Sequence, residues 1–141
     1  MRVSWAPVIA ALLFAAAGCG SRHAAQATFD RAQRRNLASA NDGARVYITN
    51  CSSCHQLDGR GIPGAFPPLA GNPMVTGDAA RVLRVVKYGQ RGPIRVAGRP
   101  YTGEMPAWDG LLSGDEIAAV VSYIRSAWRN GASEVPDQAG Y

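Results

Sequence analysis

Two cysteines three positions apart, followed at once by a histidine, have the clearest chemical potential in this sequence. Cys51 and Cys54 are separated by two serines, and His55 follows the second thiol directly. Two thiols on one short turn can reach the two vinyl groups of a single haem, and the next imidazole is then placed to bind the iron. The spacing therefore predicts covalent haem attachment, with His55 as the proximal ligand.

The same thiols could instead close a disulfide, act as a redox dithiol or form half of a zinc site. A structural zinc site needs four protein ligands, and the only other histidine, His23, lies far upstream in polar sequence. A redox dithiol is expected to open a helix after a strand, whereas only a short apolar run, residues 46–48, precedes Cys51. Haem is favoured, and the alternatives stay open at this point.

Met105 is the expected distal ligand of a haem iron. A thioether is a soft, neutral donor that suits low-spin iron, although a single methionine is more often a core residue. Met1 would be removed with an export signal, and Met74 lies close in sequence to the loop after His55. Using His23 would require the upstream segment to fold onto the domain. Met105 is far enough along the chain to reach the other face of the ring.

The stretch after His55 is rich in glycine and proline, which predicts an irregular loop that wraps the haem. A metal-bound histidine usually gives its second N–H to an acceptor, so we expect His55 to donate to the carbonyl of Pro67. Leu69 should then pack on the ring beside it.

Two helices are expected to cross next to this site. The first should begin near residue 41, capped by Asn41 or Asp42, and a capping box of Ser113 and Glu116 should begin the last, which should run to the Asn130-Gly131 pair. Glycine inside a helix costs about 1 kcal/mol relative to alanine, so Gly43 is best explained by close approach of the last helix.

Between them, a helix is predicted from Asp78 to Tyr88, with Thr76 as its cap and Gly89 at its end. Its buried face should be apolar, and Arg81, Arg84 and Lys87 should face out or partly out. Residues 94–96 alternate apolar and charged side chains, which favours a short extended piece.

The N-terminus has the pattern of an export signal. Arg2 precedes an apolar run, residues 6–17, that is too short to span a membrane. The run ends in Ala16-Ala17-Gly18-Cys19, which resembles the lipobox of bacterial lipoproteins, with Ala16 where leucine is usual. We expect lipidation of Cys19 and anchoring to a membrane. Ordinary cleavage after Ala17 would instead leave a soluble periplasmic protein.

The expected organisation is a lipoprotein-type signal peptide at 1–18, a polar tether at 19–40 that is part-helical around 29–37, a folded domain at 41–130 and a flexible tail at 131–141. The chain of 141 residues has a formal charge of +5, and Lys87 is its only lysine. Scattered arginines without interleaved aromatics argue against nucleic-acid binding and favour a docking face or a solvated surface. A docking face would attract acidic patches of a redox partner.

Over residues 41–130 the sequence resembles the class I cytochrome c family. The resemblance rests on Gly43 and Tyr47, residues 51–55, 66–72 and 105–108, and Tyr123-Ile124-Arg125. It implies an all-α fold with three main helices and irregular loops around one covalently bound haem c. It also implies a haem pocket that includes Tyr101 and Trp108, and one-electron transfer by the Fe(III)/Fe(II) couple without enzymatic activity.

A narrower likeness comes from residues 92–96 with Gly98 and Tyr101. These are similar to mono-haem cytochromes that serve quinoprotein alcohol dehydrogenases, haem-copper oxidases and some nitrite reductases. The likeness implies a periplasmic carrier between respiratory or dehydrogenase partners, or a cytochrome subunit of such a complex. A haem enzyme or sensor would need an open distal position, against which Met105 argues. A structural lipoprotein with a disulfide would not explain the glycine- and proline-rich loops.

Overall fold

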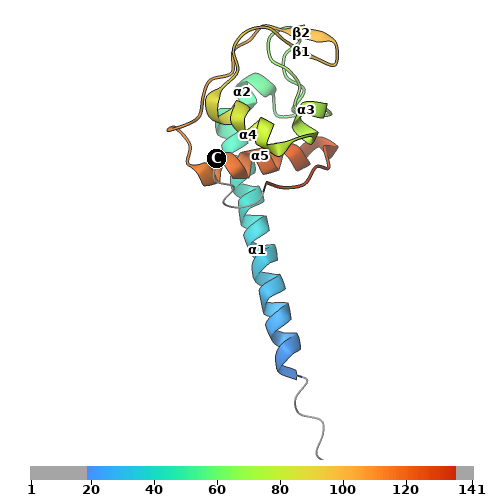
Figure 1. The fold of residues 1–141 in the computed structure, drawn as a ribbon, viewed down its shortest axis with the longest axis vertical. Coiled ribbons are helices and arrows are strands. Elements are labelled where there is room, and N and C mark those ends of the chain that lie inside the picture. Colours follow the sequence, from blue (N-terminus) through green and yellow to red (C-terminus); the bar gives the residue numbers. More distant parts are fainter. Residues whose placement is uncertain (1–18, 136–141) are drawn as a thin grey trace, which may run out of the picture. The chain divides into compact units, whose positions relative to one another are not determined.

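The computed structural model describes the backbone of residues 19–135 and the side chains of residues 24–34 and 42–135. The expected export signal, the side chains of Cys19 and His23, and residues 136–141 lie outside the described residues. Within 19–135 the elements are α1 (Cys19–Asn50), α2 (Ser52–His55), α3 (Pro73–Thr76), α4 (Ala79–Tyr88), β1 (Ile94–Val96), β2 (Arg99–Tyr101), α5 (Gly114–Ser126) and the 3-10 helix η1 (Ala127–Arg129) (Figure 1). The expected helical fold is confirmed, with one small strand pair added.

Helix α1 begins at Cys19 and not at the start expected near residue 41. Residues 21–42 contain no glycine or proline and several alanines, so intrinsic propensity favours a helix there without burial. Asp42 lies inside the helix, 4.0 Å from Arg45, and therefore does not cap it. The chain divides into two compact units after Arg34. In the first unit, the side chains of residues 24–34 are exposed.

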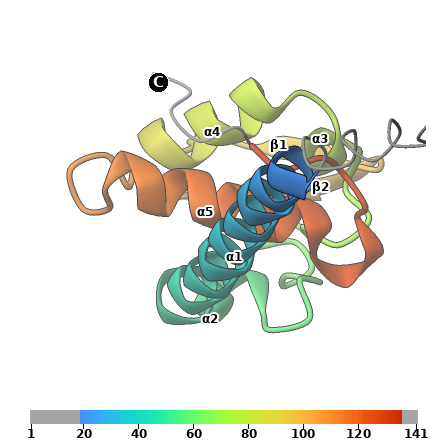
Figure 2. The ribbon, with the colours of Figure 1, turned by 90° about the horizontal axis from the view of Figure 1, so that it is seen from below.

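In the second unit, the C-terminal part of α1 crosses α5 (Figure 2). A Cβ atom on Gly43 would lie 2.8 Å from the carbonyl carbon of Ala119 and 2.9 Å from Cβ of Tyr123. The expected close approach at Gly43 is thus confirmed. Beside it, the rings of Tyr47 and Tyr123 lie 5.5 Å apart, and the ring of Trp128 lies within 5.8 Å of both. Glycine and an aromatic cluster together fix the crossing.

The capping box that begins α5 is confirmed. The hydroxyl of Ser113 accepts a hydrogen bond from the Glu116 N–H at 3.2 Å, and the Glu116 carboxylate accepts one from the Ser113 N–H at 3.0 Å. These bonds, from the backbone and then the hydroxyl of Ser113, lower the pKa of Glu116. The helix ends at Ser126, earlier than the expected stop at Asn130, because Ala127 is extended, with ψ 162°, and Trp128 follows with φ +50°.

The chain after α5 is held against the domain as far as Val135. The buried Arg125 donates from Nη1 to the carbonyl of Val75 at 2.7 Å and from Nε to that of Ser133 at 3.0 Å. Val135 is 5% exposed, and its N–H donates to the hydroxyl of Ser122 at 2.9 Å. The tail is therefore held by hydrogen bonds at Ala132, Ser133 and Val135, where we expected a loose segment.

Helix α4 is capped by Asp78, whose carboxylate accepts from the Ala80 N–H at 2.9 Å, and not by Thr76, which ends α3. Gly89 ends α4 as expected. The buried side of α4 faces α5, with which it packs (Figure 1). The buried apolar core formed around this pair includes Val46, Tyr47, Leu69, Val75, Val82, Leu83, Val86, Ile117, Val120, Val121 and Ile124.

Strand β1 confirms the expected extended piece and pairs antiparallel with β2, with Ile94 opposite Tyr101. Within the described part of the chain, no helix has the length and apolar character needed to cross a membrane.

Candidate functional site

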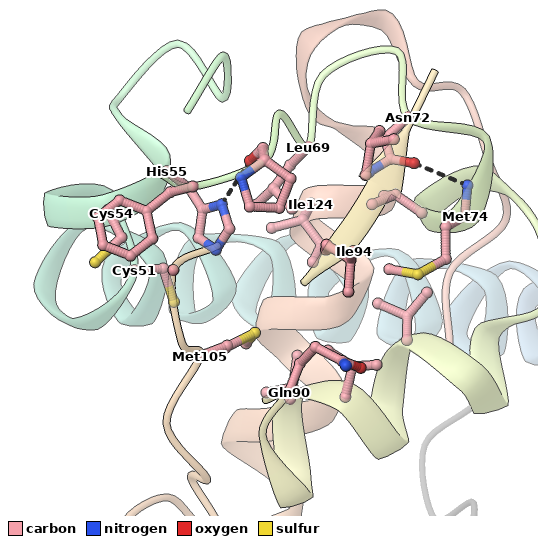
Figure 3. A pocket seen from close by; sticks show the side chains of 18 of the residues that line it. Cys51, Cys54, His55, Leu69, Asn72, Met74, Gln90, Ile94, Met105 and Ile124 are labelled. Carbon is pink, nitrogen blue, oxygen red and sulfur yellow. Dashed lines mark hydrogen bonds between the residues drawn. The ribbon is translucent and has the colours of Figure 1, made fainter. Parts of the chain in front are cut away.

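A cavity of about 720 Å³ lies among α2, the loop after it, α4, β1 and the segment that follows β2. This volume is in the range of cofactor-binding cavities, which span about 300–1,000 Å³. Its walls are mainly apolar and include all four residues expected to bind the haem: Cys51, Cys54, His55 and Met105 (Figure 3).

The turn at α2 brings the two thiols and the imidazole together. The N–H groups of Cys54 and His55 both donate to the carbonyl of Cys51, at 3.2 and 3.0 Å. Both thiols are free and half-buried, so the disulfide alternative is not what the structure contains. Burial, and then the neighbouring Cys54, raises the pKa of Cys51 to about 11. Because neither sulfur is in a disulfide, both are available to bond to a cofactor.

His55 is 8% exposed, and its Nδ1 lies 3.0 Å from the carbonyl oxygen of Pro67. Because a carbonyl can only accept, Nδ1 carries the proton and Nε2 keeps a free lone pair. Burial lowers the pKa of His55, although the Pro67 hydrogen bond acts in the opposite direction. The neutral imidazole that a metal requires is therefore favoured, and the expected His55–Pro67 bond is confirmed.

The loop that supplies Pro67 is anchored on both sides. The Gly61 N–H donates to the carbonyl of His55 at 2.9 Å, and the Leu69 N–H donates to that of Gly59 at 2.7 Å. Gly59 itself lies under the ring of Trp128, with φ +69°, where a Cβ would lie 2.6 Å from the ring. Tertiary contacts therefore fix the acceptor that orients His55.

Met105 is half-buried and reaches the cavity from the segment after β2. Figure 3 shows its thioether and the imidazole of His55 pointing into the same space from separate parts of the chain. Met74 also lines the cavity, at the start of α3, where its N–H donates to the side chain of Asn72 at 3.0 Å. Among the described residues, the thioethers of Met74 and Met105 therefore both line the cavity. Met105 lies on the segment that follows β2, and Met74 lies in α3.

Three of the four other residues expected in the haem pocket line the cavity, and one does not. Pro67, Leu69 and Trp108 line the cavity. Tyr101 is buried in β2 and does not belong to the lining.

Sequence reasoning did not include two exposed arginines, Arg81 and Arg95, among the residues that line the cavity. We expected Arg81 to face out or partly out, and it is exposed while also lining the cavity. Arg95 is exposed too and lines the cavity together with its neighbours Ile94 and Val96, although strand alternation separates it from them. Haem carries two carboxylates, and arginine binds carboxylates bidentately, so these two side chains are suited to hold them. The only sequence signal for this role was a positive charge beside apolar residues.

No cluster of three or more His, Cys, Asp and Glu side chains suited to a metal ion occurs among the described residues. A zinc site at Cys51 and Cys54 therefore lacks its remaining protein ligands in that part of the chain.

An apolar cavity with two thiols and a neutral imidazole in its wall fits a covalently held porphyrin, so the fold and the site define a haem protein. The family model described as cytochrome c matches residues 40–128. The chain belongs to the cytochrome c family. Its cofactor is covalently bound haem c, and Cys51 and Cys54 have the spacing of the attachment motif.

Similar proteins include free cytochromes and parts of larger subunits. Cytochrome c-552 of Thermus thermophilus is 45% identical over 96 residues, which cover 65% of this chain and 63% of that protein. The cytochrome c subunit of a quinone alcohol dehydrogenase of Gluconobacter oxydans is 43% identical over 93 residues, 65% of this chain but 19% of that subunit. The gluconate 2-dehydrogenase cytochrome c subunit of Pantoea cypripedii is 33% identical over 120 residues, 80% of this chain and 27% of that subunit.

Proposed function

We propose that this chain carries single electrons through one haem, with Cys51 and Cys54 as the thioethers and His55 and Met105 as the axial ligands. The observation that carries the proposal is that all four side chains line one cavity. The haem supplies a one-electron Fe(III)/Fe(II) couple. With a nitrogen and a sulfur ligand in place, the iron offers no position to a substrate, so the chain is a carrier and not a catalyst.

The carrier acts either alone or as a cytochrome subunit of a larger dehydrogenase or oxidase complex in the periplasm. The likeness to the quinone alcohol dehydrogenase and gluconate 2-dehydrogenase cytochrome subunits supports the second form. The likeness to cytochrome c-552 supports the first.

A basic surface is proposed to guide its redox partners. Residues 79–103 contain no aspartate or glutamate but six basic residues: Arg81, Arg84, Lys87, Arg91, Arg95 and Arg99. The five arginines are exposed, and two of them line the cavity. Such a field accelerates encounter with acidic patches while leaving the complex free to dissociate, as electron transfer requires.

Stopped-flow kinetics of the full-length holoprotein test both proposals. Oxidation of the ferrous protein by hexacyanoferrate(III), an anion, should consume one equivalent of oxidant per haem, and that equivalent takes up one electron. The reaction should slow as ionic strength rises, because salt screens the attraction to the basic residues. Oxidation by the cationic tris(phenanthroline)cobalt(III) should accelerate over the same salt series. A stoichiometry other than one electron per haem would contradict the carrier. If the two oxidation rates responded to salt in the same way, the proposed basic surface would be contradicted, and the proposed electron carrier would not.

We also propose that the mature chain is exported and anchored to a membrane by a lipid on Cys19. The apolar run at residues 6–17 and the Ala-Gly-Cys ending support this. In a bacterial host, the wild-type chain should fractionate with membranes and show the added mass of a lipidated cysteine, whereas Cys19→Ala should not be lipidated. Ser21→Ala is the matched control and should behave like the wild type. A water-soluble wild-type protein that begins at Gly18 would show ordinary signal cleavage instead.

A further inference from the structure

The segment that carries Met105 is fastened to the end of α4 by backbone hydrogen bonds. The Gln90 N–H donates to the Met105 carbonyl at 3.0 Å, and the Met105 N–H donates to the Gln90 carbonyl at 2.9 Å. This reciprocal pair uses both backbone polar groups of Met105. The position of the Met105 backbone, from which the thioether extends, is therefore set by Gln90, two residues beyond the end of α4.

The same segment satisfies the free carbonyls of α4. The last four carbonyls of a helix have no partner inside it. The Trp108 N–H lies 3.2 Å from the carbonyl of Val86 and 3.1 Å from that of Lys87, which also accepts from the Asp109 N–H at 3.0 Å. The chain is thus bound to α4 both at Met105 and three residues beyond it.

Gly89 is the residue that makes this approach possible. It ends α4 with φ +77°, and a Cβ atom there would lie 2.6 Å from the Met105 carbonyl oxygen and 2.9 Å from the Ala107 nitrogen. Gly92 has nearly the same backbone, φ +83°, but no heavy atom within 4 Å of its Cβ position. The backbone conformation explains a glycine at both positions, and the crowding is specific to Gly89.

We propose that Gly89 and Gln90 are positioning residues that hold the Met105 thioether in place on the cavity wall, an inference that rests on Met105 as the distal ligand. The fixed backbone limits the positions open to the sulfur. The end of α4 therefore sets how firmly the distal side of the iron is closed to other ligands.

Comparison of Gly89→Ala with Gly92→Ala in the ferric holoprotein tests this role. Both variants strain a left-handed backbone, but only Gly89→Ala should push the Met105 backbone away from α4. We expect Gly89→Ala to weaken the far-red Met–Fe(III) charge-transfer band and to raise the rate of cyanide binding to the haem by about tenfold or more. Gly92→Ala should keep the wild-type band and rate. Equal behaviour of the two variants would overturn the inference.

The wild-type protein supplies a second measurement in case Gly89→Ala does not fold. The amide protons of Gln90, Met105 and Trp108 should exchange with solvent as slowly as those inside α4. Exchange as fast as at the exposed Arg91 would overturn the proposed fastening. A wild-type ferric protein without the charge-transfer band would instead contradict Met105 as the ligand, and with it the proposed function.

Discussion

Replacing Met105 by alanine is expected to lower the reduction potential of the haem by on the order of 100 mV or more, and to open one iron position to water. The thioether is a soft ligand that stabilises Fe(II) relative to Fe(III), and alanine offers no donor in its place. Spectroelectrochemical titration measures the potential, and the ferric spectrum should change from low-spin to high-spin with loss of the far-red band.

Met74→Ala is the matched control, because Met74 is also a half-buried thioether in the cavity wall. This variant removes a similar apolar volume without removing the proposed ligand, so the band and the low-spin spectrum should remain. If Met74→Ala lost the band while Met105→Ala kept it, the distal ligand would have to be reassigned to Met74.

Replacing Gly43 by alanine is expected to reduce the free energy of unfolding of the holoprotein by about 2–3 kcal/mol. Helix propensity alone favours alanine by about 1 kcal/mol, so the intrinsic effect has the opposite sign. The clash decides, since the new Cβ would lie 2.8 Å from the carbonyl carbon of Ala119 and 2.9 Å from Cβ of Tyr123. Denaturant unfolding followed by circular dichroism gives the difference.

Gly114→Ala is the corresponding control on α5. Gly114 is also helical, but its Cβ position has no heavy atom within 4 Å. Alanine there should leave the free energy of unfolding unchanged or raise it by about 0.5 kcal/mol. If both variants lost a similar free energy of unfolding, the crossing of α1 and α5 would not depend on the absence of a side chain at Gly43.

The features that sequence reasoning placed correctly are those determined within a few residues or by chemistry that leaves few choices. The capping box of Ser113 and Glu116 needs only one turn of chain, and the spacing of Cys51, Cys54 and His55 is itself the motif. The carbonyl of Pro67 could be anticipated because a ligating imidazole needs an acceptor for its second N–H, and the proline-rich loop that follows His55 supplies backbone carbonyls.

The errors concern competition between local signals and tertiary contacts. Thr76 and Asp78 both have N-cap side chains, and only the three-dimensional path assigns Thr76 to the end of α3. The Asn130-Gly131 pair looked like a helix stop, but the chain leaves helical geometry at Ala127, with ψ 162°. The Nε1 of the next residue, Trp128, donates to the carbonyl of Leu57, 71 residues away, at 3.1 Å. No local pattern contains that contact.

Two further differences have other causes. The first part of α1 is helical by alanine-rich propensity, which the polar composition of residues 19–40 concealed. Arg95 lines the cavity together with Ile94 and Val96, whereas a two-residue period would put Arg95 on the opposite face of an extended strand.

Because Arg125 and Ser122 bind the tail, the tail must be kept when this domain is moved into a fusion protein. The cytochrome c match ends at residue 128, yet the guanidinium of Arg125 and the hydroxyl of Ser122 find partners at Ser133 and Val135. A graft cut at the end of the match would leave both side chains without those partners and would uncover the surface that Val135 fills. The transplantable unit is therefore longer than the family pattern by at least the residues up to Val135, and a fusion partner should be joined beyond them.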